Sequence, residues 1–162
     1  MQTFIRLSIF KILNGSMPNT LPWVGIILLV TFSLRIFLFL VAQPWNTEAY
    51  SEHVMYPDSG SYLDMTAGFL RGEIFDSVSL HRTPGYPAFI AAIFLFTSNS
   101  IIELILMQII LDTATVFFVM RTASMISKSK LVVNFSGVVY GLSIFAAVAC
   151  GKILTESLFT FL

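Results

Sequence analysis

Long apolar runs constrain this chain more than any other feature of its sequence. The stretch from Leu21 to Ala42 carries a single charge, Arg35, in 22 positions. About 20 apolar residues in a helix suffice to cross the hydrocarbon core of a membrane. Two further runs of this kind extend from Ile101 to Met120 and from Leu131 to Gly151. The sequence therefore predicts an integral, multi-pass membrane protein.

The composition supports this prediction and excludes a soluble globular domain. Only 11% of the residues are charged, whereas soluble domains average about 25%. The apolar runs lack the alternating pattern of barrel strands, and a backbone in lipid must satisfy its own hydrogen bonds. We therefore predict an all-α, polytopic bundle of transmembrane helices.

Several classes of function find no support in the sequence. The net charge is zero, so no nucleic-acid partner is indicated. One cysteine, Cys150, and two histidines cannot build a zinc cluster of the usual kind. Phosphate-binding loops of soluble nucleotide enzymes are absent from the sequence. We therefore expect neither a metal nor another cofactor.

The interval of residues 43–100 is predicted to be a loop that carries two helices on the membrane surface. Residues 59–71 place apolar side chains at helical spacing, with Asp58 or Ser59 as the N-cap and Gly72 as the stop. A second helix, about residues 86–97, is apolar but would reach only about 20 Å. The hydrocarbon core measures about 30 Å, so we expect this helix to be interfacial or re-entrant.

Basic residues predict the topology, because Lys and Arg concentrate on the cytoplasmic side of membrane proteins. Five of the nine Lys and Arg residues lie in two segments that contain no acidic residue, one near the N-terminus and one after the second long run: Arg6, Lys11, Arg121, Lys128 and Lys130. Two crossings, by residues 21–42 and 101–120, put both segments on the cytoplasmic side. The loop 43–100 and the segment from Lys152 to Glu156 then lie outside.

A fourth apolar run begins at Leu158 and is five residues long. We expect residues 1–162 to be the N-terminal part of a larger transmembrane domain, with three complete spans and the start of a fourth.

Three polar clusters are predicted to meet on the outer face: residues 56–62, 81–87 and 152–157. In the first, Asp58 could accept a proton from an incoming hydroxyl or amine. A plain helix N-cap is an equally good interpretation of the same carboxylate.

The other two clusters contain an arginine and a glutamate with similar alternatives. Arg82 precedes a turn with two prolines and could bind a phosphate, or it could contact lipid headgroups. Tyr86 could be an aromatic-belt residue. Glu156 could contribute to a site, or it could pair with Lys152 four residues earlier.

Two charges lie inside the predicted spans. Arg35 and Asp112 are costly in lipid, so they should face protein or water. We predict that they pair with each other and rank this structural role above a proton relay.

At the outer clusters the sequence resembles the membrane-embedded glycosyltransferases of the GT-C fold. The similarity is to the dolichyl-phosphate-mannose protein mannosyltransferase type and its bacterial homologues, which include the lipid A aminoarabinose transferases. It covers roughly residues 20–162. The matching residues are Asp58, Tyr62, Ala67, Leu70, Gly72, the run Arg82 to Phe89 and the run Leu154 to Leu158.

This resemblance implies a fold, a reaction and a set of site residues. Family members move a sugar from a polyprenyl-phosphate carrier to a lipid, glycan or protein acceptor at the outer face, with inversion. Asp58 corresponds to the catalytic base and Arg82 to the residue that contacts the carrier phosphate. Tyr62, Tyr86 and Glu156 are expected to bind substrate. The resemblance also implies a bacterial or archaeal cell membrane with the active face outside.

Two other functions fit the sequence. The chain could be a non-catalytic transporter or assembly subunit, because charges inside spans often mark a pathway. It could also be an inactive, truncated transferase.

Overall fold

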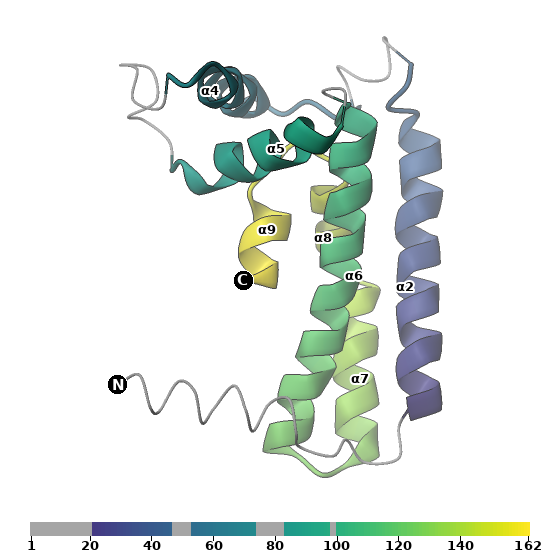
Figure 1. The fold of residues 1–162 in the computed structure, drawn as a ribbon. Helices are drawn as coiled ribbons and strands as arrows, with labels where there is room; N and C mark the ends of the chain where they lie inside the picture. Colours follow the sequence, from purple (N-terminus) through teal and green to yellow (C-terminus); the bar gives the residue numbers. More distant parts are fainter. Residues whose placement is uncertain (1–20, 47–52, 74–82, 98–99) are drawn as a thin grey trace, which may run out of the picture.

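The structure, a computed structural model, describes residues 21–46, 53–73, 83–97 and 100–162, and the elements in these ranges are helices (Figure 1). They are α2 (Leu21–Ala42), α4 (Ser59–Arg71), α5 (Gly85–Phe96), α6 (Ile101–Ile126), α7 (Lys130–Gly141), α8 (Ile144–Cys150) and α9 (Glu156–Phe161). The predicted all-helical class is confirmed for this part of the chain.

Three helices run side by side and form the body of the molecule (Figure 1). The helix α6 packs against both α2 and α7. Two helices, Pro22–Ala42 and Ile101–Ile126, are long and apolar enough to cross a membrane. A third crossing is present if α7 and α8 are counted as one bent span.

The helices α4 and α5 lie across one end of this bundle, which we call the loop end (Figure 1). They pack against each other. Tyr62 of α4, together with Tyr86 and Ile90 of α5, belongs to a buried cluster that continues into Leu104 and Ile105 of α6. The α5 helix has 12 residues, and its transverse position agrees with the prediction that it does not cross.

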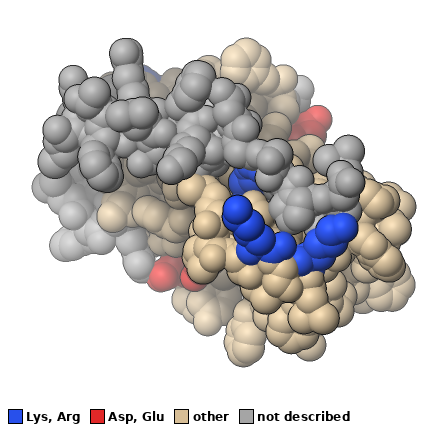
Figure 2. Space-filling model, turned by 90° about the horizontal axis from the view of Figure 1, so that it is seen from below, with Lys and Arg blue, Asp and Glu red and all other residues tan. Residues whose placement is uncertain are grey.

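The opposite end of the bundle carries basic residues, and we call it the basic end. Here α6 ends and α7 begins, with Lys128 and Lys130 at the connection. Figure 2, a view onto this end, shows Lys and Arg side chains gathered over it. The α2 helix begins at the same end (Figure 1). The other predicted cytoplasmic segment, with Arg6 and Lys11, lies outside the described residues.

The predicted third span, residues 131–151, is interrupted in the structure. The helices α7 and α8 meet at a bend of 50°. Ser143 starts the second helix, because its Oγ accepts a hydrogen bond from the Ala146 amide at 3.4 Å. The bend was not predicted, and residues 131–151 cross the membrane only if the two helices form one bent span.

Two other predicted boundaries also differ. The α6 helix continues six residues beyond Met120, to Ile126. No proline or glycine occurs between Arg121 and Ile126, so the helix continues past the apolar run. The α9 helix begins at Glu156 and thus precedes the predicted start at Leu158.

Candidate functional site

The start of α4 is joined to the connection between α8 and α9, although the two segments are far apart in the sequence. The Ile153 amide donates to the Val54 carbonyl at 3.2 Å. The Ser59 hydroxyl donates to the Ile153 carbonyl at 2.9 Å. These bonds bring the turn that contains Asp58 against the segment that leads into Glu156.

Asp58 occupies the N-cap position of α4, but its side chain makes no capping hydrogen bond. Its backbone lies in the αR region, with φ −86° and ψ −14°, whereas a capping residue usually has an extended conformation. Ser59 does not cap the helix either, because its Oγ accepts from the Tyr56 amide at 2.9 Å. The predicted cap is therefore wrong, and neither side chain is used for that purpose.

Two predicted site residues, Tyr62 and Tyr86, contact each other between α4 and α5. Their rings pack edge to face, with centroids 5.1 Å apart. Tyr86 is completely buried, and its hydroxyl donates to Oε1 of Gln108. Tyr86 therefore does not face lipid as an aromatic-belt residue would, and a direct bond from its phenol to substrate would require the contact with Gln108 to open.

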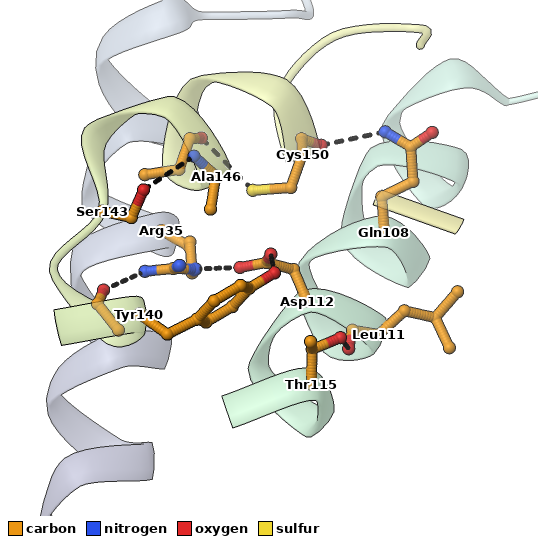
Figure 3. A network of polar contacts seen from close by, with 11 residues as sticks. Arg35, Gln108, Leu111, Asp112, Thr115, Tyr140, Ser143, Ala146 and Cys150 are labelled. Atoms are coloured by element: carbon orange, nitrogen blue, oxygen red, sulfur yellow. Dashed lines mark hydrogen bonds and ion pairs between the residues drawn. The ribbon is translucent and has the colours of Figure 1, made fainter. Parts of the chain in front are cut away.

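Gln108 is a residue of the candidate site that the sequence analysis did not single out. Its Nε2 donates to the carbonyls of Cys150 at 2.9 Å and Lys152 at 2.8 Å; Figure 3 shows the first of these bonds. Through Tyr86 it also holds α5. An uncharged amide in the middle of an apolar run was the signal that could have revealed it, because polar groups inside spans need partners.

The electrostatics place a negative charge close to the buried phenol of Tyr86. Burial raises the pKa of this phenol well above its ordinary value, and the carboxylate of Glu156 and the phenol of Tyr62 raise it further. The phenol therefore remains a hydrogen-bond donor. It also follows that three predicted site residues, Tyr62, Tyr86 and Glu156, lie within electrostatic reach of one another.

Glu156 is exposed at the first position of α9 and lines a cavity of about 550 Å³. Tyr56, Lys152 and Ser157 line the same cavity, and its other walls are mainly apolar. The predicted pair of Lys152 with Glu156 is not among the ion pairs of the described residues. Lys152 precedes α9 instead of sharing a helix face with Glu156, and its Nζ lies 5.2 Å from the centroid of the Tyr56 ring.

The predicted pair of Arg35 and Asp112 is confirmed and lies at the bend between α7 and α8 (Figure 3). Arg35 Nε donates to the Asp112 carboxylate, and Nη1 donates to the Gly141 carbonyl at 2.6 Å. The hydroxyl of Tyr140 donates to the second carboxylate oxygen at 2.9 Å. Arg35 and Asp112 are buried, so the network links α2, α6 and α7 inside the bundle.

Arg82 lies outside the described residues, and its placement beside Asp58 and Glu156 stays a prediction. Among the residues that the structure describes, no group of three or more His, Cys, Asp or Glu could hold a metal ion. No family model, curated protein or solved structure matches this chain.

Proposed function

We propose that this chain is a membrane glycosyltransferase of the GT-C type. It would move a sugar from a polyprenyl-phosphate carrier to a lipid, glycan or protein acceptor at the non-cytoplasmic face. The observation that supports this most directly is the junction at the loop end, where Ser59 bonds to Ile153. This junction joins two of the three segments that carry the family resemblance.

The roles follow from the chemistry that inversion requires. In a single displacement, the acceptor oxygen or nitrogen attacks the anomeric carbon, its proton passes to a base, and the carrier phosphate leaves. Asp58 suits the base because it lies at the loop end, in the turn that Ser59 bonds to the segment before Glu156. Arg82 would contact the departing phosphate.

The remaining site residues would hold the substrates in place. Glu156 faces the cavity of about 550 Å³, whose mixture of polar and apolar walls suits a molecule that has a sugar and a lipid chain. Tyr62 packs on Tyr86, which is fixed by Gln108. The aromatic pair would thereby fix α4, the helix that follows the base.

The proposal is tested by substituting the base in the full protein. Asp58→Asn keeps the size of the side chain and removes its basicity. Membranes containing the variant are supplied with polyprenyl-phosphate mannose and polyprenyl-phosphate aminoarabinose, and sugar transfer is measured. We expect a loss of about 10²–10⁴-fold, the usual contribution of a general base.

Asp64→Asn is the matched control, because Asp64 is an exposed carboxylate on the same helix. Its transfer rate should equal that of the unaltered protein. A second variant, Arg82→Ala, should reduce transfer by weakening contact with the carrier. Undiminished transfer by both Asp58→Asn and Arg82→Ala would refute the site assignment.

A further inference from the structure

The connection between α8 and α9, residues 151–155, is not helical, and its backbone is bonded on two sides. On one side lies the turn before α4, through the Ser59 hydroxyl and the bond from the Ile153 amide to the Val54 carbonyl. On the other side lies Gln108 of α6. Buried backbone groups outside a helix need partners of this kind. The groups that supply these bonds therefore determine where the connection lies.

The amide of Gln108 is completely buried, and both of its donor hydrogens are used. Nε2 donates to the carbonyls of Cys150 and Lys152, and Oε1 accepts from the Tyr86 hydroxyl. If the amide were turned over, its oxygen would face two carbonyl acceptors, so only one orientation satisfies all three bonds. Gln108 therefore holds α5, the end of α8 and the connection in one arrangement.

The connection leads directly into Glu156, the first residue of α9. Glu156 and Lys152 line the cavity of about 550 Å³, whereas Gln108 does not. Gln108 bonds to the carbonyl of Lys152 at 2.8 Å, four residues before Glu156. Its effect on a molecule in the cavity must therefore pass through the connection and not through direct contact.

We propose that Gln108 is a positioning residue of the transferase site, which holds Glu156 at the cavity through the connection. This inference rests on the proposed function, in which Glu156 binds substrate. Loss of the two carbonyl bonds would release the connection and with it the start of α9. The carboxylate of Asp58 would stay chemically intact, so substrate binding should be weakened more than turnover.

The first test is the kinetics of Gln108→Met, made in the full protein. Methionine has a similar volume but cannot donate to the two carbonyls. With the polyprenyl-phosphate sugar that the unaltered protein uses, we expect KM to rise about tenfold and kcat to change much less, as for lost hydrogen bonds that serve binding. Partial unfolding would instead lower the apparent kcat and leave KM unchanged. Thr122→Val, an exposed position of the same helix, should change neither.

A double variant tests whether Gln108 acts through Glu156. Glu156→Gln should itself raise KM, because it weakens the contact with substrate. If Gln108 positions that side chain, the combined loss in Gln108→Met with Glu156→Gln is much smaller than the product of the two single losses. Losses that multiply would overturn the inference, as would an unchanged KM in Gln108→Met.

The hold on the connection is also tested without sugar transfer. Cys150 is the only cysteine, its side chain is buried, and its carbonyl accepts from Gln108. In Gln108→Met the thiol should react with N-ethylmaleimide about tenfold faster, because the end of α8 opens more often. An unchanged rate overturns the inference whether or not sugar is transferred. A faster rate in a protein that transfers no sugar refutes the proposed function but not the hold of Gln108 on the connection.

Should Gln108→Met fail to fold, Gln108→Glu decides. Glutamate keeps the size of the side chain and the acceptor for the Tyr86 hydroxyl, but it has at most one proton for two carbonyls. KM and the labelling rate of Cys150 should both rise, as in Gln108→Met. Values equal to those of the unaltered protein in both measurements overturn the inference.

Discussion

Arg35 is the residue in which fold and chemistry meet most closely. Its Nη1 donates to the Gly141 carbonyl at the bend between α7 and α8. Its Nε donates to the carboxylate of Asp112, which neutralises the charge of the guanidinium. Tyr140 completes the environment of that carboxylate. An ion pair inside a bundle contributes little net stability when intact, but removal of one partner leaves a buried charge. Removal of one partner should therefore cost more than the intact pair contributes.

Asp112→Asn should destabilise the protein strongly. The substitution keeps the side-chain size but leaves the charge of Arg35 uncompensated in a buried position. We expect a loss of about 3–5 kcal/mol, as found when one partner of a buried pair is removed. The measurement is denaturant unfolding in detergent micelles, followed by circular dichroism.

Glu103→Gln is the matched control for this substitution, because Glu103 is an exposed carboxylate on the same helix. Its stability should be close to that of the unaltered protein. The double variant Arg35→Met with Asp112→Leu should regain much of the lost stability. If Asp112→Asn unfolds at the same denaturant concentration as the unaltered protein, the ion pair does not hold the bundle together.

At the scale of helices, the sequence predicted the first and last residues well where neighbouring residues determine them. The predicted bounds 21–42 and 59–71 agree with α2 and α4. The length of the apolar run defines the first helix, and apolar periodicity together with Gly72 defines the second. Gly72 adopts φ 82°, the left-handed conformation that a glycine stop requires. The bend after Gly141 was not predicted; at this position the Gly141 carbonyl accepts from Arg35, a contact between residues more than a hundred positions apart.

The close approach of α2 and α7 gives a prediction at this scale. A Cβ added at Gly141 would overlap the side-chain oxygen of Thr31 on α2. Gly141→Ala should therefore destabilise the protein by about 1–3 kcal/mol, the usual cost of overpacking. The measurement is again unfolding in micelles.

Two companion variants test whether the overlap is the cause. Thr31→Ala should restore stability in the Gly141→Ala background, since it removes the overlapping atom. Gly25→Ala, where the added Cβ meets no atom within 4 Å, should leave stability unchanged or raise it by up to about 1 kcal/mol. Equal losses at Gly141 and Gly25 would contradict the proposed contact.

At the scale of the molecule, the arrangement of helices gathers parts of the candidate site that are separate in the sequence. Charge counting predicted that the Asp58 turn and the Lys152 to Glu156 segment share one face, and the structure joins them. Sequence reasoning could not predict which atoms make the junction. Gln108 and Ser59 achieve it through carbonyl groups of the backbone, and backbone carbonyls leave no pattern in a sequence.

The same arrangement makes the topology testable. Glu73, just after α4, lies at the loop end, and Ser129, just before α7, lies at the basic end; Glu73 and Ser129 are exposed. With Cys150→Ala as background, we expect Glu73→Cys in intact cells to react with a membrane-impermeant maleimide. Ser129→Cys should react only after permeabilisation, because Lys and Arg hold the basic end on the cytoplasmic side. If the two positions react from the same side, α6 does not cross the membrane; if their sides are exchanged, the proposed active face is cytoplasmic and a transferase acting outside is excluded.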